Sequence, residues 1–343
     1  MSALCIHFGT CGGCAHQDSA DADYRALKRG MVTDALRRHG VAAEVGEVVE
    51  VPPATRRRCV FKIKNGAVGF HARASHTIVD MRECRVLTPG LVGLAQLLRD
   101  IAGEIGTAEA HATEADNGFD LALRWRHRPT PGLIGQLAQW AGRNKVARIV
   151  AGNEVVVALA APVTRVGKAE LRLPPHAFLQ PTREGERFLQ QSVTTALDGA
   201  KAALDLFAGC GTFALALAER MKVHAVETEG AMLNALTQAA RATPGLKPVT
   251  TERRDLVKRP LQARELDAFD AAVLDPPRAG AAAQVAELAR SRLRRVAYVS
   301  CNAESFARDA RVLADSGWRM APVVPVDQFL WSEHIELVAS FRR

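Results

Sequence analysis

The sequence predicts an α/β fold: a mostly parallel sheet in the second half of the chain, preceded by a β-rich α+β region. Two observations indicate the parallel sheet. Strand-forming runs alternate with helix-forming stretches, and these strands are expected at residues 203–206, 223–227, 271–275 and 295–300. The first strand is followed by a loop containing Gly209 and Gly211, and then by a helix expected at 214–221. That order of strand, tight glycine turn and helix is typical of a nucleotide-binding unit.

The chain is long enough for two domains, each with its own hydrophobic core. It has 343 residues, of which 48% are hydrophobic and 24% charged, an ordinary balance for a globular protein. The pattern changes near residue 170, so we expect one domain at 1–172 and a second at 173–343. No run of about 18 apolar residues is present, and the N-terminus lacks a secretory pattern. We therefore expect a cytoplasmic protein with no membrane partner.

The net charge of +8 is distributed unevenly along the chain. Between residues 51 and 85, two acids stand against eight basic residues: Arg56, Arg57, Arg58, Lys62, Lys64, Arg73, Arg82 and Arg85. Such a local excess indicates an anionic polymer as the partner, either RNA or DNA. The alternatives are a basic surface that only keeps the protein soluble, and arginines that pair with acids inside the domain.

Three cysteines lie close together at the N-terminus. Cys5, Cys11 and Cys14 fall in the run CIHFGTCGGC, and no secretory pattern supports a disulfide framework. Their spacing indicates metal ligands, with Cys84 or Cys59 as the fourth. It differs from the paired spacing of common zinc sites and suits an iron–sulfur cluster better. The alternative is a set of reduced cysteines that only pack in the interior.

The first half is expected to be rich in short strands. Helices are predicted at 22–39, 91–105 and 134–143, and strands within 45–79, at 121–126 and at 155–159. Asn65-Gly66, between two apolar runs, is a strong hairpin signal. The end of the chain differs from the region before it, because strands expected at 320–326 and 335–341 have no helix between them. They should form an antiparallel pair at the edge of the parallel sheet.

Polar residues follow three of the predicted parallel strands. Glu227 ends the second strand, where an acid can accept hydrogen bonds from ribose hydroxyls, although ordinary strand-end acids are also common. LDPPRAG and YVSCN end the fourth and fifth strands, so both should meet the glycine loop at the carboxyl edge of the sheet. Cys301 of YVSCN could serve there as a nucleophile, its thiolate favoured by the following helix N-terminus. The alternative is simple burial of one cysteine.

Taken in order, these motifs resemble those of the RNA 5-methyluridine (uracil-C5) methyltransferases. The resemblance covers nearly the whole chain, and its motifs are the cysteine cluster, YRALK, IVDMREC, FLQ, DLFAGCGTF, LDPPRAG, SCN and DQF…HIE. It implies the class I methyltransferase fold, a Rossmann-like seven-stranded sheet, with an N-terminal β-rich domain carrying a cysteine-ligated cluster. It also implies S-adenosylmethionine as the methyl donor and RNA as the substrate.

The resemblance implies roles for particular residues. Cys301 matches the nucleophile that adds to carbon 6 of uracil, and Glu336 matches the base that removes the carbon 5 proton. Asp275 would hold the target base or the amino acid part of the cofactor, and Arg278 would contact RNA or stabilise the fold. The residues expected to bind the cofactor are Gln180, Phe207, Gly209, Gly211, Thr212, Glu227 and Asp275. The expected ligands of a 4Fe-4S cluster are Cys5, Cys11, Cys14 and Cys84, which leaves Cys59 and Cys210 without a role.

The chain departs from the family pattern at three positions. Thr212 and Thr182 stand where Asn is common, and either change could weaken a cofactor or uracil contact. Leu330 stands where Pro is usual after DQF. We also expect no TRAM β-barrel, which many members use to bind RNA.

We expect the substrate to be 23S rRNA and the protein to be a monomer. The cysteine cluster favours rRNA, because the tRNA enzymes of the family generally lack these four cysteines; a tRNA substrate is the alternative. A 5-methylcytosine enzyme is disfavoured because DPPRAG holds no cysteine, and an amino-group methyltransferase because Arg278 replaces the aromatic residue expected there. A non-enzymatic RNA-binding protein is disfavoured by the presence of both Cys301 and Glu336.

Overall fold

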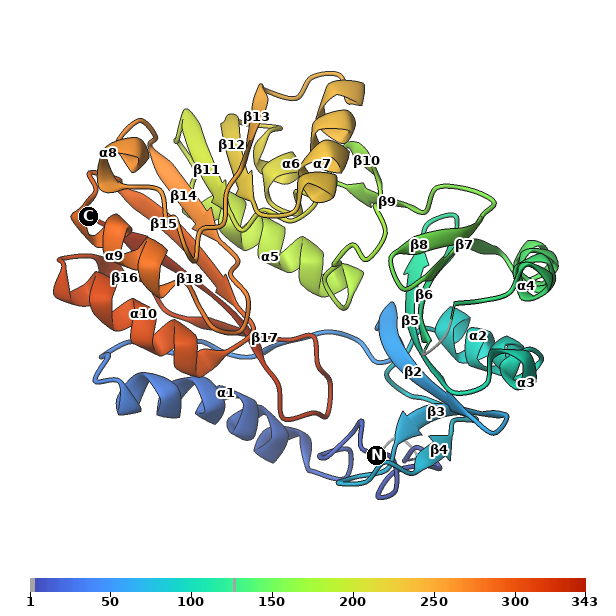
Figure 1. The fold of residues 1–343 in the computed structure, drawn as a ribbon. Helices are drawn as coiled ribbons and strands as arrows, with labels where there is room; N and C mark the ends of the chain where they lie inside the picture. The colour runs from blue at the N-terminus through green and yellow to red at the C-terminus, as the bar shows by residue number, and fades with distance from the viewer. Residues whose placement is uncertain (1–3, 126–127) are drawn as a thin grey trace.

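The computed structural model describes residues 4–125 and 128–343 and contains two large sheets (Figure 1). The helices are α1 Asp21–Arg38, α2 Pro89–Arg99, α3 Ala102–Ile105, α4 Pro131–Arg143, α5 Arg183–Ala196, α6 Ala214–Leu217, α7 Gly230–Ala242, α8 Ala263–Leu266, α9 Ala282–Arg290 and α10 Ala303–Asp315. Of the helices in these residues, none combines the length and apolar character needed to cross a membrane.

The strands of the first half are short, as expected. They are β1 Val49–Glu50, β2 Arg58–Lys64, β3 Ala67–His71, β4 Ile78–Asp80, β5 Ala108–Ala115, β6 Gly118–Trp125, β7 Val146–Ala151, β8 Glu154–Ala158, β9 Val163–Val166 and β10 Ala169–Arg172. The strands of the second half are β11 Ala202–Leu206, β12 Lys222–Glu227, β13 Val249–Arg253, β14 Ala271–Leu274, β15 Arg295–Ser300, β16 Arg319–Met320, β17 Val324–Asp327 and β18 Glu336–Arg342.

The second half forms a nine-stranded sheet in the order β13-β12-β11-β14-β15-β18-β17-β1, with β16 pairing β18. Strands β11 to β15 are mutually parallel, whereas β18 is antiparallel to both β15 and β17. The parallel sheet with a terminal antiparallel pair is therefore confirmed. The sheet contains two short strands beyond the seven expected. One is β16, and the other is β1, which pairs in parallel with β17 through Val49 and Val326.

Helices cover both faces of this sheet. One core packs α5, α6 and α7 against it, with Leu189, Phe213 and Leu236 fully or almost fully buried. The opposite core packs α1, α9 and α10, and Figure 1 shows α1 running beside α10. The helix predicted at 22–39 is thus confirmed. Because α1 and β1 both pack on the C-terminal sheet, the N-terminal segment is tied to it; the domain division at residue 172 stays a prediction.

The first half folds around a seven-stranded sheet in the order β4-β3-β2-β5-β6-β7-β8. The predicted hairpin is confirmed: Asn65 and Gly66 have φ of 52° and 78°, and they join β2 to β3. The helix expected at 91–105 is divided into α2 and α3, because the amide of Ile101 donates to Leu98 three residues back and ends the α-helical pattern. Of the strand expected at 121–126, Arg126 lies outside the described residues.

Candidate active site and cysteine cavity

The glycine loop follows β11 and turns sharply beside the end of β12. Phe207 has φ of 65°, and the amides of Phe207 and Ala208 both donate to the carbonyl of Val226. A side chain at Gly211 could not be accommodated, since a Cβ there would lie 2.4 Å from Leu236 and φ is +95°. The turn thus brings backbone amides to the carboxyl edge of the sheet, where a nucleotide cofactor binds in this class of fold.

Glu227, at the end of β12, contacts this loop directly. One carboxylate oxygen accepts from the Gly209 amide at 2.9 Å, and the other accepts from Thr228 at 2.6 Å and Glu229 at 3.0 Å. The structure therefore brings Glu227 to the glycines, as the sequence predicted. Thr212 is held from the other side, because Gln190 donates to its carbonyl at 2.9 Å.

Cys301 directly follows β15 and precedes α10. Asn302 is the N-cap of α10, accepting from Glu304 at 3.0 Å and Ser305 at 3.4 Å, and it donates to the carbonyl of Arg278 at 3.0 Å. The side chain of Asn302 therefore joins the SCN and DPPRAG segments. Cys301 lines a cavity of about 490 Å³ together with Arg278 and the segment before β18.

Two acids, buried Glu336 and half-buried Asp275, lie near the thiol. Glu336 begins β18 and is 3% exposed; burial, and then the charge of Asp275, raise its pKa well above the usual value. Burial raises the pKa of Asp275 to about 7. Burial, followed by the charges of Glu336 and Asp275, raises the pKa of Cys301 to about 11, while Arg278 opposes the shift. Nucleophile, acids and guanidinium thus lie close enough to influence one another.

A chain of hydrogen bonds positions Asp275 and Gln180. Thr182 donates to Gln328 at 3.4 Å, Gln328 donates to the Gln180 oxygen at 3.0 Å, and Gln180 donates to Asp275 at 3.3 Å. Thr182 also caps α5 by accepting from Gly185 at 3.1 Å. The threonine that departs from the family pattern therefore has two structural contacts. The sequence singled out Gln328 only as part of the DQF motif, and it could not predict the contact between Gln328 and Gln180.

Asp205, in the interior of β11, is a second residue to which sequence reasoning gave no role. It is fully buried, and burial, with the charge of Asp275, raises its pKa to about 8. The only sequence signal was an acid inside an apolar run, directly before the glycine loop.

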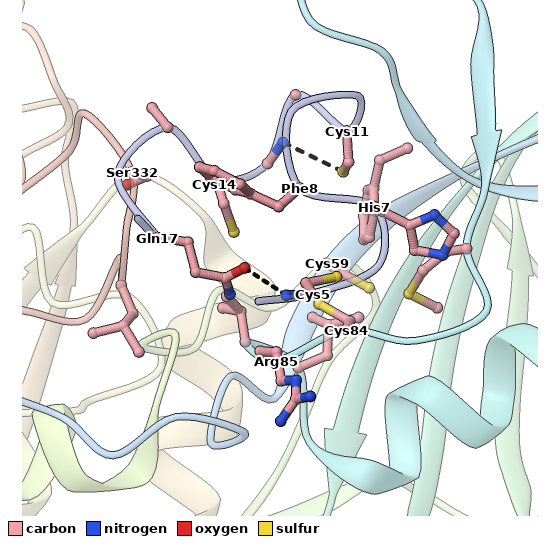
Figure 2. A pocket seen from close by; sticks show the side chains of 18 of the residues that line it. Cys5, His7, Phe8, Cys11, Cys14, Gln17, Cys59, Cys84, Arg85 and Ser332 are labelled. Carbon is pink, nitrogen blue, oxygen red and sulfur yellow. Dashed lines mark hydrogen bonds between the residues drawn. The ribbon is translucent and has the colours of Figure 1, made fainter. Parts of the chain in front are cut away.

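The N-terminal cysteines line a second cavity, of about 530 Å³, together with Cys59 and Cys84 (Figure 2). Cys5, Cys11, Cys14 and Cys84 therefore line one cavity, and their role as ligands stays a prediction. The amide of Cys5 donates to Gln17 at 2.8 Å, which holds the start of the chain against the cavity. In residues 4–125 and 128–343, no three His, Cys, Asp or Glu side chains are arranged to bind a single metal ion. The 4Fe-4S cluster stays a prediction.

One segment separates the two cavities. It is the loop at residues 328–335 between β17 and β18, which we call the β17–β18 loop. Its residues Glu333 and His334 line both the Cys301 cavity and the cysteine cavity. Arg56, which lines the cysteine cavity, lies 5.5 Å from the centre of the Phe329 ring. The loop is therefore a common wall between the two sites.

The basic segment at 51–85 faces solvent only in part. Arg57 is 1% exposed and donates to Glu186 at 2.6 Å, so the expectation that it contacts RNA is wrong. The guanidinium of Arg58 stacks 4.2 Å from the Phe178 ring. Three others pair with acids: Lys62 with Glu109, Arg82 with Asp80, and Arg85 with Glu83. Within the described part of the chain, Lys64 and Arg73 are exposed and have no acid within 4.0 Å.

Comparison with known proteins decides the family. A sequence profile described as tRNA (Uracil-5-)-methyltransferase matches residues 137–342. The chain belongs to this family. Its relatives include an uncharacterised RNA methyltransferase of Rhizobium meliloti, 42% identical over 99% of this chain and 85% of the relative. Another is the 23S rRNA (uracil(1939)-C(5))-methyltransferase of Pectobacterium atrosepticum, 32% identical over 98% of this chain and 79% of the relative.

A solved structure agrees in fold. The tRNA (uracil-54, C5)-methyltransferase of Pyrococcus abyssi, in complex with S-adenosyl-L-homocysteine, has a TM-score of 0.72 and 22% identity, covering 94% of this chain and 84% of that one. The expected methyltransferase fold is confirmed. Family membership likewise confirms an S-adenosylmethionine-dependent RNA methyltransferase that acts on carbon 5 of uracil.

Proposed function

We propose that the protein methylates carbon 5 of a uridine in 23S rRNA through a covalent bond between Cys301 and the uracil ring. One observation carries the proposal. Cys301 and Arg278 line one cavity at the edge of a methyltransferase sheet, and two acids, half-buried Asp275 and buried Glu336, lie close enough to raise the pKa of the Cys301 thiol. These are the groups that the reaction requires.

The chemistry follows from the weakness of carbon 5 as a nucleophile. In the proposed mechanism, the thiolate of Cys301 adds to carbon 6, and the electron pair moves into the ring to give an enolate. Bound S-adenosylmethionine supplies an electrophilic methyl group, which carbon 5 then takes. The Glu336 carboxylate removes the proton from carbon 5, the double bond between carbons 5 and 6 reforms, and the thiolate leaves.

The residues at the glycine loop fit the cofactor. Gly209 leaves room for close approach of a ligand to the backbone, since no atom lies within 4 Å of a Cβ placed there, and the Glu227 carboxylate stands beside it, as a ribose-binding acid must. We assign the adjoining positions Phe207 and Thr212 to the same site. Gln180 and Asp275, joined at 3.3 Å, complete it on the side nearer Cys301.

The rRNA substrate is supported by the 23S rRNA enzyme of Pectobacterium atrosepticum, which is similar over 98% of this chain. The test is mass mapping of 5-methyluridine in rRNA and tRNA from a strain in which the gene is deleted, with the gene restored as the control. We expect loss from 23S rRNA alone. Loss from tRNA with rRNA unchanged would overturn the rRNA assignment, and no loss from either would overturn the methylation proposal.

We also propose a 4Fe-4S cluster held by Cys5, Cys11, Cys14 and Cys84. Five thiols line a cavity near one another, a donor set that suits iron. In such a cluster each iron takes one protein thiolate, so the ligands surround a volume and need not converge on one ion. Anaerobically purified protein should contain about four irons and four sulfides per chain. Stoichiometric zinc without iron would refute the assignment.

Three further expectations belong with this proposal. Residues 1–172 would form the cluster-bearing, RNA-binding domain, and residues 173–343 the catalytic domain. The protein would act as a monomer. An enzyme of rRNA works where ribosomes are made, which places it in the cytoplasm.

A further inference from the structure

The β17–β18 loop leads directly into Glu336, and its anchorage comes from far away in the sequence. Asp327, the last residue of β17, is fully buried just before the loop begins. Glu336 is the first residue of β18, just after the loop ends. The position of the Glu336 carboxylate therefore depends on how the two ends of this loop are held.

Lys28 of α1 holds both ends. Its ammonium group is fully buried and donates to Asp327 Oδ1 at 2.9 Å and to the Phe329 carbonyl at 3.2 Å, at the start of the loop. It also donates to the His334 carbonyl at 2.5 Å, two residues before Glu336. An ammonium has three protons to donate; two go to carbonyls of this loop and the third to Asp327, directly before it.

Tyr24, one helical turn earlier on α1, fixes the middle of the same loop. Its hydroxyl donates to the other oxygen of Asp327 and accepts from the Trp331 amide at 2.6 Å. The segment before α1 adds two more bonds, because the amides of Ala15 and His16 donate to the Trp331 carbonyl at 2.7 Å and 3.1 Å. The loop is thus bound at its start, middle and end by residues 15–28.

Stability alone does not explain a buried lysine in this place. Removing an ammonium and a carboxylate from water costs several kcal/mol, and replacing such a pair by well-packed apolar residues is often neutral or stabilising. What a buried, fully hydrogen-bonded pair can supply is a unique geometry. Here the geometry that it fixes is that of the segment leading to Glu336.

We propose that Lys28 and Tyr24 are positioning residues that hold the β17–β18 loop so that Glu336 reaches the carbon 5 proton of the uracil. The inference rests on the proposed function of Glu336 as the base. It assigns the N-terminal helix α1 a specific part in the last step of the reaction, the elimination of the methylated uracil. It assigns α1 no part in the first step, the attack by Cys301, because Cys301 lies at the end of a different strand.

The test is a single-turnover reaction with RNA and S-adenosylmethionine, in which capture and release are measured separately. Covalent protein–RNA adduct is quantified on denaturing gels, and methylated free RNA is quantified over time. The variants are Lys28→Met, which keeps the length of the side chain without its donors, and Tyr24→Phe, which removes a single oxygen. Arg25→Met is the matched control, because exposed Arg25 lies on the same helix but donates to Glu50 of β1 and not to the β17–β18 loop.

We expect Lys28→Met to slow release by about 10- to 100-fold, part of the contribution of a general base, and to accumulate methylated adduct. Capture should change by less than about threefold, and Tyr24→Phe should act in the same direction more weakly. Arg25→Met should leave both steps unchanged. Equal slowing of capture and release in Tyr24→Phe and Lys28→Met would indicate a general structural role and overturn the proposal.

Two outcomes separate this inference from its premise. If Glu336→Gln forms adduct while folded Tyr24→Phe releases RNA at the normal rate, the positioning role is wrong and the base assignment stands. If Glu336→Gln forms no adduct although it binds RNA, the base assignment itself fails. Should Lys28→Met not fold, as judged by circular dichroism, Tyr24→Phe alone decides the question.

Discussion

The two cavities on either side of the β17–β18 loop both contain cysteines, yet their surroundings differ. In the catalytic cavity a single thiol, Cys301, stands at a strand end beside Asp275 and Glu336. In the other, five thiols line one space, and Glu83 is the acid nearest to them in sequence. A lone thiol among proton-transfer groups suits covalent catalysis, whereas several thiols together suit metal ligation. The neighbours of a cysteine, more than the residue itself, determine its chemistry.

Removing one thiol from each cavity is the strongest test of whether the two cavities have different functions. Cys301→Ala should abolish methyl transfer, by about 10⁴-fold or more, because no other group can form the bond to carbon 6. The iron content of the Cys301→Ala protein should be normal. Cys14→Ala should lose iron and unfold at a lower temperature, with methyl transfer reduced but detectable. Methyl transfer assays, iron analysis and thermal unfolding of both proteins provide the measurement.

The opposite pattern would contradict the comparison. Iron loss in Cys301→Ala, or complete loss of covalent capture in a folded Cys14→Ala, would mean that the two cavities do not have separate functions.

A second pair of substitutions tests which cysteines of the cysteine cavity bind the cluster. Cys84 and Cys59 both line this cavity, and the resemblance assigns only Cys84 to the cluster. Both cysteines pack against the apolar core of the first half, so packing does not distinguish them. Following the assignment, Cys84→Ala should lose most of the iron, whereas Cys59→Ala, on β2, should retain it. Iron per chain after anaerobic purification is the measurement. Iron loss in Cys59→Ala with retention in Cys84→Ala would reverse the assignment.

A third prediction concerns the acidity of the catalytic thiol. With its pKa raised to about 11, Cys301 is mainly a thiol at neutral pH, so its alkylation by iodoacetamide should still be rising at pH 10. Glu336→Gln removes a negative neighbour and should speed alkylation at a given pH, and Arg278→Ala should slow it. Peptide mass spectrometry resolves Cys301 from the other cysteines. A plateau below pH 8 would contradict the effect of burial and the acids.

The smallest expected effect concerns RNA binding by the basic segment. Lys64 and Arg73 are the exposed members of the basic segment without an acid partner in the described residues. Replacing each by Ala should weaken RNA binding and lower the slope of log affinity against log salt by roughly one unit per contact. The buried Arg57 serves as the contrast, since Arg57→Ala should lower stability through Glu186. An unchanged salt slope in the Lys64–Arg73 double variant would mean that RNA binds elsewhere.

The sequence predicted those parts of the fold and site that depend on local patterns. Alternating strands and helices, the Asn65-Gly66 turn and the strand-end motifs all have short-range causes, and the structure contains them. Strand β5 was missed because its run AEAHATEA, at 108–115, is rich in alanine, a poor strand former. Strand β13, with four polar residues in VTTER, gave equally little apolar signal.

Contacts between distant segments could not be predicted. Tyr24 and Lys28 appeared only as letters of a motif near the first helix, and nothing local in the sequence pairs them with Asp327, 303 and 299 residues away. The burial of Arg57 against Glu186 is a similar case, because a cluster of three arginines looks like a surface until the fold is known. Burial and long-range pairing are tertiary properties, and composition alone does not fix them.

The central claim is that Cys301 attacks and Glu336 eliminates, and one measurement tests it most directly. Glu336→Gln is incubated with RNA lacking the modification and with S-adenosylmethionine carrying a labelled methyl group, beside the double variant Cys301→Ala/Glu336→Gln. The account predicts a methyl-labelled protein–RNA adduct in the single variant, stable on denaturing gels, and none in the double variant. A folded, RNA-binding Glu336→Gln protein that releases methylated RNA normally, or that forms no adduct, would contradict the account.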